Sequence, residues 1–230
     1  MPLLTLEHVT VRYAGGAQRD GAALRDVSLS IETGELIVVV GPRSSGRTTL
    51  MRIAAGLTSP STGRVRFAGV DLKRHAMIGA PNGIGYAMTH FEPTVGGSVL
   101  EQVAAPMLGR GCSMLRARAI AYTLLRRAGV AGCASLAAEE LGCVETLRVA
   151  VARALVTAPS LLLVDDPADL PPNCEHDGLV GLLRAIAHHD SVAVVLTTDP
   201  GPVPEGVDGV FMLDRGALFP LPPCPAAFAP

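Results

Sequence analysis

The sequence predicts an α/β fold in which the strands of a sheet are joined by helical crossovers. Short apolar runs recur at 36–40, 161–164 and 192–196, and the first of them is rich in β-branched residues. Such runs are typical of strands that are buried on both faces of a parallel sheet. The segments between them show helical periodicity, and this alternation of strands and helices indicates an α/β sheet with crossover connections.

The N-terminal part adds strands of a different kind. Alternating apolar and polar residues indicate half-buried strands at 3–12 and 24–31. After the apolar run that follows them, a helical pattern ends at Gly56, a residue type that often caps a helix C-terminus. Two further short strands are expected, at 64–67 and 84–88.

From about residue 90 to 150 the chain is helical throughout, which predicts a helical subdomain inserted into the connectivity of the sheet. The remaining elements are expected as helices at 98–109, 113–129, 147–156 and 179–188, and as strands at 161–164, 192–196 and 209–213. We therefore predict one domain over residues 1–218. The segment 219–230 is rich in proline and is expected to be irregular.

Composition excludes several classes of function. The chain has 230 residues, which suits one large domain, and its net charge is −2. We expect no nucleic-acid partner, because no basic stripe with interleaved aromatic residues is present. No apolar run reaches the ~18–20 residues that span a bilayer, so we expect a soluble chain. The 5 cysteines include no C-x-x-C pair, which favours reduced thiols in a cytosolic protein over a disulfide framework or a zinc site.

A glycine-bounded loop follows the first apolar run and predicts phosphate binding. The spacing G-x-x-x-x-G-[K]-[ST] is met by Gly41, Gly46 and Thr48, with Arg47 in place of the lysine. A strand, a small polar loop and a helix start direct backbone N–H groups and a helix dipole at an anion. The candidate phosphate-binding residues are Gly41, Pro42, Arg43, Ser44, Ser45, Gly46, Arg47, Thr48 and Thr49. The alternative is an ordinary strand–turn–helix connection.

Several blocks together resemble the ATP-binding domain of an ABC transporter over nearly all of residues 3–218. The blocks are ALRDVSLSIETGEL, GPRSSGRTTLMRIAAGLTSPSTGRV, RVAVARALVTAPSLLLVDDP and VDGVFMLDRGAL, and they stand in the family's order and spacing. The resemblance implies a P-loop NTPase fold with a mixed central sheet, an N-terminal antiparallel β subdomain and an inserted helical subdomain. It also implies ATP and Mg²⁺ as cofactors. The implied partners are an integral membrane permease and a second ATP-binding subunit, in a homodimer or heterodimer on the inner face of the cell membrane.

The resemblance assigns roles to residues outside the loop. Tyr13 stands where the family stacks an aromatic ring on adenine, and Thr48 and Asp165 stand where it binds Mg²⁺. Thr89 takes the place of a glutamine that touches Mg²⁺ and relays to the membrane partner. Asp166 takes the place of the glutamate that polarises the attacking water. Because aspartate is one methylene shorter, we expect Asp166 to be a poor base.

The sequence also departs from the family inside the phosphate loop. The family's middle glycine is replaced by Ser44, which adds a Cβ where the backbone wraps the phosphate. In place of the lysine stands Arg47, which is still cationic but is longer, planar and forked. We therefore expect this loop to bind nucleotide weakly.

The family's signature LSGGQ and its switch histidine are also altered. The signature appears as Leu141 followed by Gly142, Cys143, Val144 and Glu145, which removes a hydroxyl and adds a negative charge beside the expected phosphate. The alternative interpretation is that this segment is simply a helix start. Thr198 stands in place of the histidine that contacts the γ-phosphate.

The groups that hold nucleotide are thus better kept than those that break its bond. We expect an ATP-binding subunit that binds ATP weakly, hydrolyses it slowly or not at all, and acts as a structural or regulatory half on a permease. One alternative is an active ABC transport ATPase with unusual motif residues. Another is an interaction protein on the same fold that binds no nucleotide. The spacing of helices in residues 98–135 resembles exporters of the lipoprotein-release and cell-division type.

Overall fold

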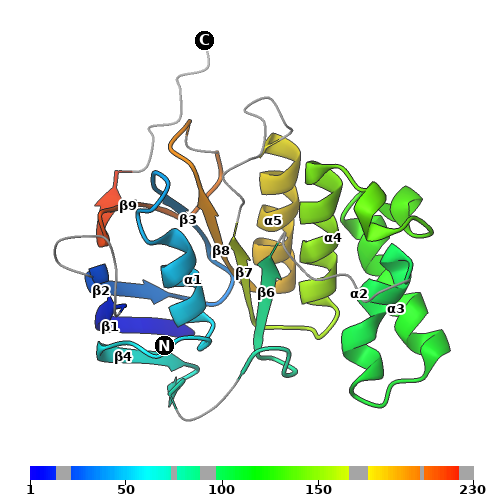
Figure 1. The fold of residues 1–230 in the computed structure, drawn as a ribbon, viewed down its shortest axis with the longest axis horizontal. Coiled ribbons are helices and arrows are strands. Elements are labelled where there is room, and N and C mark those ends of the chain that lie inside the picture. Colours follow the sequence, from blue (N-terminus) through cyan, green and yellow to red (C-terminus); the bar gives the residue numbers. More distant parts are fainter. Residues whose placement is uncertain (14–21, 74–76, 89–96, 166–175, 203–204, 223–230) are drawn as a thin grey trace.

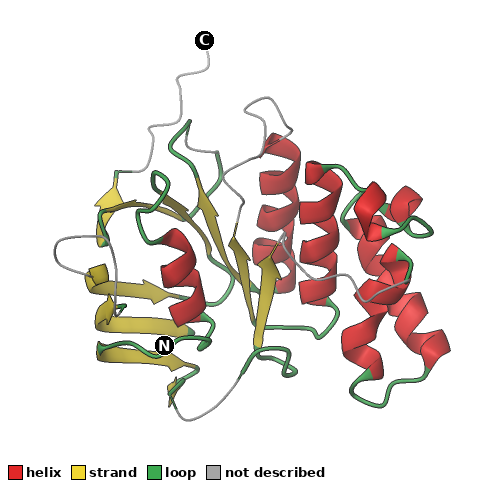
Figure 2. Cartoon of the chain, in the orientation of Figure 1, coloured by secondary structure: helices red, strands yellow, loops and turns green. Residues whose placement is uncertain are grey.

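The computed structural model describes residues 1–13, 22–73, 77–88, 97–165, 176–202 and 205–222. In these residues two sheets lie on one side of the molecule, and a lobe of helices lies on the other (Figure 1). The larger sheet is sandwiched between helix α1 on one face and helices α4 and α5 on the other (Figure 2). The predicted α/β class is confirmed.

The larger sheet has six strands in the order β10-β9-β3-β8-β7-β6. The strands from β9 to β6 run parallel, and β10 pairs with β9 antiparallel, so the sheet is mixed as expected. Their bounds are β3 Leu36–Val40, β6 Ile84–Met88, β7 Leu161–Asp165, β8 Ala193–Thr198, β9 Gly209–Asp214 and β10 Ala217–Leu221.

The smaller sheet is antiparallel, with the order β2-β1-β4-β5. Its strands are β1 Leu4–Arg12, β2 Ala22–Ile31, β4 Thr62–Phe67 and β5 Val70–Asp71. Alternate residues of β1 are buried, which explains the alternation in the sequence: one face packs on α1 and the other is open. The N-terminal antiparallel β subdomain is therefore present.

The helices are α1 Arg47–Ala54, α2 Val99–Leu108, α3 Met114–Arg127, α4 Cys143–Leu155 and α5 His176–Asp190, with short 3₁₀ turns at Ala131–Cys133 and Ala138–Glu140. Helix α2 begins with a capping box, in which Ser98 accepts from the Glu101 N–H and the Glu101 side chain accepts from the Ser98 N–H. Helices α2, α3 and α4 share an apolar core, and α2 and α3 form the outer lobe (Figure 1).

All residues of β3 are buried because the strand has helices on both sides. Ile37 and Val39 face the core around α1, while Leu36, Val38 and Val40 face the core around α4 and α5. This two-sided burial is the physical reason for the unbroken apolar run in the sequence.

The structure corrects some expected boundaries. Strand β10 continues to Leu221, so the irregular segment does not begin at residue 219; the pairing of β10 with β9 overrides the proline there. Helix α4 begins at Cys143 rather than at residue 147. Within the described residues, no helix is both long and apolar enough to cross a membrane.

Candidate nucleotide-binding site

The phosphate loop follows β3 and is held by the end of β8 and by the turn between β9 and β10. The Gly41 N–H donates to the Thr198 carbonyl over 3.1 Å, and the Gly216 N–H donates to the Ser45 carbonyl over 2.9 Å. A Cβ on Gly41 would lie 2.5 Å from the Leu213 carbonyl oxygen, so only glycine fits here. Backbone hydrogen bonds thus hold the loop at the carboxyl edge of the sheet.

Two residues of this loop have left-handed backbone conformations. Gly46 has φ 110°, and a Cβ there would lie 2.4 Å from the Ala23 carbonyl oxygen. Ser44 has φ 64°, which costs a residue with a Cβ about 1–2 kcal/mol relative to the right-handed region. The position that the family fills with glycine therefore carries a strained serine in this chain.

Helix α1 begins directly after the loop and points its N-terminus into it. Gly46 is the N-cap, no side chain caps the helix, and its first turn holds no acidic residue. The backbone N–H groups of a first turn have no intrahelical acceptor and favour an anion. The Thr48 side chain is exposed and Thr49 is half-buried.

Arg47 lies inside this site rather than in solvent. It is 8% exposed, and its Nη2 donates to Oδ1 of Asp199 over 2.7 Å. Its Nη1 and the Ser45 Oγ are both buried, and neither has a hydrogen-bond partner among the described residues. Buried polar atoms usually have partners, so each of these two atoms could still form a hydrogen bond.

Asp165 ends β7 at the same edge of the sheet. Its Oδ1 accepts from Thr197 Oγ1 over 2.8 Å, and its Oδ2 accepts from the Tyr86 hydroxyl over 3.2 Å. Burial, reinforced by the charge of Asp165 and this hydrogen bond, raises the pKa of Tyr86 well above its usual range, so the hydroxyl stays a donor. Each carboxylate oxygen keeps a further lone pair. Carboxylate and hydroxyl oxygens are ligand types that Mg²⁺ accepts, so Asp165 and Thr48 remain candidate metal ligands.

Tyr13 follows a strand whose partner strand contacts the phosphate loop at Gly46. It follows β1, and its side chain is 46% exposed, as a stacking platform requires. The preceding residue, Arg12, pairs with Ala22, and the next carbonyl along β2, that of Ala23, packs against Gly46. Tyr13 thus remains a candidate for stacking on a base.

The altered signature segment forms the start of α4. Gly142 is the N-cap, and a Cβ on it would lie 2.5 Å from Oε2 of Glu145. The Glu145 carboxylate is therefore folded back over the N-terminus of its own helix. Cys143 is exposed and Val144 is half-buried. A segment that begins a helix and carries its own anion there is unfavourable for phosphate.

Two predicted site residues, Thr89 and Asp166, lie outside the described residues. Thr198 ends β8, half-buried, and its carbonyl holds the phosphate loop through Gly41. Sequence reasoning missed Asp199, Thr197 and Tyr86. The register of the sheet could have indicated Thr197, because it pairs with Asp165, but no local pattern indicated that Asp199 would contact Arg47.

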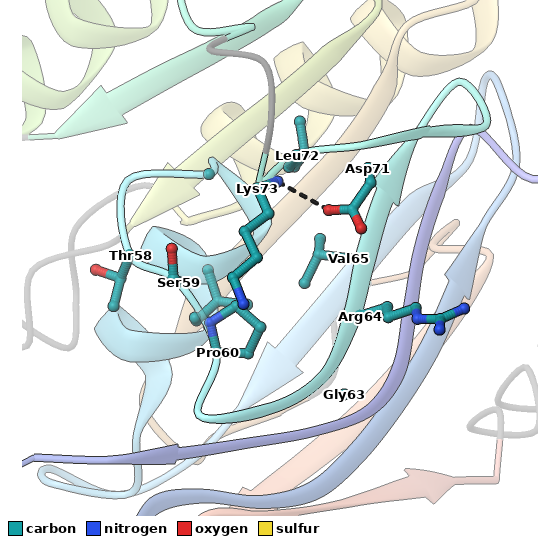
Figure 3. A pocket seen from close by; sticks show the side chains of 11 residues that line it. Thr58, Ser59, Pro60, Gly63, Arg64, Val65, Asp71, Leu72 and Lys73 are labelled. Carbon is teal, nitrogen blue, oxygen red and sulfur yellow. Dashed lines mark hydrogen bonds between the residues drawn. The ribbon is translucent and has the colours of Figure 1, made fainter.

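A pocket of about 150 Å³ lies at the C-terminal end of α1, the end away from the phosphate loop. Figure 3 shows the side chains that line it. The backbone of Lys73, which lines this pocket, donates to Asp71 over 2.9 Å. The other residues that line it are Ile53, Gly56, Thr58, Ser59, Pro60, Gly63, Arg64, Val65 and Leu72. It contains no residue of the phosphate loop, so it is separate from the candidate nucleotide site.

Comparison with known proteins agrees with this geometry. Residues 24–169 match the family described as ABC transporter. The chain is 35% identical to the lipoprotein-releasing system ATP-binding protein LolD of Chromohalobacter salexigens, over 94% of this chain and 92% of that protein. It is 30% identical to the pyoverdine export ATP-binding/permease protein PvdT of Pseudomonas fluorescens, over 86% of this chain and 31% of that protein.

Solved structures give the same result. The dimeric structure of MJ0796, a bacterial ABC transporter cassette, matches with a TM-score of 0.81 and 25% identity, over 94% of this chain and 96% of that one. The dimeric post-hydrolysis state of MJ0796, bound to ADP and Pi, matches with a TM-score of 0.80 and 25% identity, over 94% of this chain and 96% of that one. Together with the fold and the phosphate loop, these similarities show that the chain belongs to the ABC transporter family, as an ATP-binding subunit.

Proposed function

We propose that this subunit binds ATP weakly, hydrolyses it slowly or not at all, and serves as a structural or regulatory half on a membrane permease. The observation that carries this proposal is the Glu145 carboxylate, which covers the N-terminus of α4. In the family, this helix start grips the γ-phosphate held by the opposite subunit. A carboxylate there repels the phosphate instead.

The binding half of the site supports retained affinity for nucleotide. The start of α1 carries no acidic side chain. The buried Arg47 Nη1 and Ser45 Oγ have no hydrogen-bond partner among the described residues, so each could still form a hydrogen bond. Thr48 and Asp165 would hold Mg²⁺, which neutralises phosphate charge when bound. The strain at Ser44 and the pairing of Arg47 with Asp199 oppose tight binding.

The residues expected to act in ATP hydrolysis support slow turnover. Thr198 carries no charge to place on the γ-phosphate, and Asp166 is shorter than the family's glutamate. Loss of a positioned base costs ~10²–10⁴ in rate, and loss of a transition-state donor costs ~10²–10³. These losses do not multiply simply, because the groups act as a unit. Two of them would still slow a turnover of ~1–100 per second, the range of kinases, to about one event in minutes.

A permease partner is supported by a cleft between the edge strand β6 and the helical subdomain. Its volume is about 240 Å³, and it reaches Met88, which directly precedes Thr89. Its other lining residues are Ile78, Gly79, Ile84, Gly85, Tyr86, Pro106, Ala150, Arg153, Ala154 and Thr157. One relative joins ATP-binding and permease parts in a single protein. We propose that the permease docks at this cleft and holds the subunit at the inner face of the membrane.

Pairing with a second ATP-binding subunit does not restore full activity in this proposal. Each composite site takes one chain's phosphate loop and the other chain's signature. A homodimer would combine Arg47 with Glu145 in both sites. With an intact partner, each site would still contain one altered half. The matching MJ0796 structures are dimeric, which supports pairing of two such subunits.

A second candidate is an active transport ATPase in which Arg47 and Asp166 substitute adequately for the family's residues. It is favoured by the 35% identity with a lipoprotein-releasing ATP-binding protein over 94% of this chain. Such a subunit would energise a related export system.

Two measurements on the purified chain distinguish these functions. Equilibrium titration with ATP and Mg²⁺ tests binding, and we expect weak but saturable binding. Steady-state phosphate release tests hydrolysis, and we expect almost none, both in the native chain and in Arg47→Lys. Brisk Mg²⁺-dependent release by the native chain would establish the active ATPase instead. Complete absence of ATP binding would instead favour the alternative of an interaction protein that binds no nucleotide.

A further inference from the structure

Arg47 and Asp199 join the phosphate loop to the segment that follows β8. The side chain of Arg47 is 9% exposed and that of Asp199 is 44% exposed, and their Nη2 and Oδ1 atoms are 2.7 Å apart. The two residues start from the same edge of the sheet, because β3 and β8 run parallel with Val40 opposite Thr198. The ion pair therefore lies at the edge of the sheet that carries the phosphate loop.

Only one arm of the Arg47 guanidinium is used in this pair. Nη1 is buried and has no hydrogen-bond partner within the described ranges. A guanidinium is a planar fork that pairs well with either a carboxylate or a phosphate, which a compact lysine ammonium does less specifically. Asp199 thus gives Arg47 an anionic partner of the same kind as the phosphate that the loop would bind.

We propose that Asp199 is an internal competitor of the nucleotide phosphates, which holds Arg47 when no nucleotide is present. A phosphate that enters the loop must either replace Asp199 as the hydrogen-bond acceptor of Arg47, or bind Arg47 together with Asp199 and be repelled by its carboxylate. Asp199 is then a positioning residue that acts through Arg47 and sets the affinity of the site. This inference rests on the proposed function, because it assumes that the loop binds ATP.

Substitution Asp199→Asn separates the two partners. Asparagine keeps the size and one acceptor oxygen but removes the negative charge. The unliganded protein should become less stable, because a buried guanidinium loses its counter-charge. ATP should bind at least about tenfold more tightly, since a charge-assisted contact to Arg47 becomes available to the phosphate. The thermal stabilisation by ATP should therefore be larger than in the native chain.

Asp190 offers a matched control. It ends α5, forms an ion pair with Arg127, and is similarly accessible, at 35%. It precedes β8, whose length places it about 20 Å from Asp199 along the strand direction. The change Asp190→Asn alters the net charge equally and should leave the affinity for ATP within about twofold.

A double-mutant cycle tests whether Asp199 acts through Arg47. In an Arg47→Gln background, the change Asp199→Asn should alter ATP affinity by less than about threefold. AMP provides a second readout: it lacks the β- and γ-phosphates, so Asp199→Asn should strengthen binding of ATP and ADP but not of AMP. A purely structural role for Asp199 would not produce this dependence on phosphate number.

The experiment measures equilibrium binding of ATP, ADP and AMP, each with Mg²⁺, to the full chain and to these variants. Asp199→Ser serves as a second substitution if Asp199→Asn folds poorly.

Tighter binding of ATP by Asp199→Asn that disappears in the Arg47→Gln background supports the inference. If the native chain binds ATP and Asp199→Asn binds it equally or less well, the competitor role is wrong while the proposed function stands. An equal gain in the Arg47→Gln background would show a general charge effect and also overturn it. If no variant binds ATP, both the inference and the proposed function fail.

Discussion

Thr197 and Asp165 are joined across the central sheet: the Thr197 hydroxyl donates to Oδ1 of Asp165 over 2.8 Å, in the register that pairs them on β8 and β7. Thr197 is fully buried, and Tyr86 donates to the other oxygen of the same carboxylate. Hydroxyl donors on both sides therefore fix the orientation of Asp165. The candidate metal ligand is held by the fold itself.

Removal of the Thr197 hydroxyl should weaken both the fold and the metal site. Thr197→Val keeps the branched shape but leaves a half-buried carboxylate oxygen without its donor, which should cost about 1.5–3 kcal/mol of unfolding free energy. Urea unfolding measures this loss. The exposed Thr123, whose hydroxyl donates only to its own helix backbone, is the control. Thr123→Val should change stability by less than about 0.5 kcal/mol. Equal effects of the two changes would show that the hydrogen bond to Asp165 is not special.

Two neighbouring loop positions should respond in opposite directions to changes in Cβ. Ser44 is strained by its φ of 64°, so Ser44→Gly should raise stability by up to about 1 kcal/mol after the entropy cost of glycine. At Gly46, a Cβ would meet the Ala23 carbonyl oxygen at 2.4 Å, so Gly46→Ala should destabilise by several kcal/mol or prevent folding. Thermal unfolding compares both. A loss of stability in Ser44→Gly would contradict the assigned strain.

Neutralising the signature segment should weaken its own helix and strengthen pairing of subunits. Glu145→Gln removes the carboxylate from the N-terminus of α4, which should cost about 0.3–1 kcal/mol of stability. The same change removes repulsion of a γ-phosphate on an opposite chain. We therefore expect stronger ATP-dependent self-association, measured by sedimentation with ATP and Mg²⁺. The change Glu139→Gln, in the 3₁₀ turn before this helix, controls for net charge and should leave self-association unchanged.

Stability at acid pH should depend on Asp208. Although partial burial opposes its ionisation, hydrogen bonds from the Leu36 N–H and His188, with the charge of His188, lower the pKa of Asp208 below 3.8. A carboxyl group with a lowered folded-state pKa contributes stability above its unfolded-state value and loses it as the pH falls through the folded-state value. The native chain should thus lose stability as the pH falls below about 4. Asp208→Asn should flatten this loss, measured by urea unfolding between pH 6 and acid conditions of about pH 2.

Asp214, exposed on the next strand, provides the control for removal of a carboxylate. Asp214→Asn should keep the native dependence on pH. If Asp208→Asn also keeps it, the contact between Asp208 and the start of β3 is not responsible.

The sequence predicted the fold well because its signals are local. The buried strands, the alternation in β1 and the glycine at the end of α1 each follow from the burial or backbone geometry of a few consecutive residues. A candidate site could be proposed from the sequence only where a motif carries the chemistry, as in the phosphate loop. The ion pair of Arg47 with Asp199 joins residues that are 152 positions apart in the sequence. The position of the Glu145 carboxylate beside Gly142 depends on the conformation of one side chain. Neither leaves a pattern in the sequence.

Strand β10 shows the opposite case, in which tertiary pairing overrides a local signal. Pro220 lies in this strand and suggested irregular structure, because proline cannot donate to a ladder. The strand lies at the edge of the sheet and needs donors on one side only, so the proline is tolerated there.

The fate of a single bound ATP tests the central claim most directly. The pure chain, in excess over radiolabelled ATP with Mg²⁺, should hold the nucleotide intact for minutes, because in our proposal the groups that bind phosphate are altered less than the groups that cleave it. Quenching at intervals and measuring the ratio of ADP to ATP gives the rate of cleavage without interference from product release. Conversion of the bound ATP to ADP within about a second, the timescale of an efficient phosphoryl-transfer enzyme, would contradict the account.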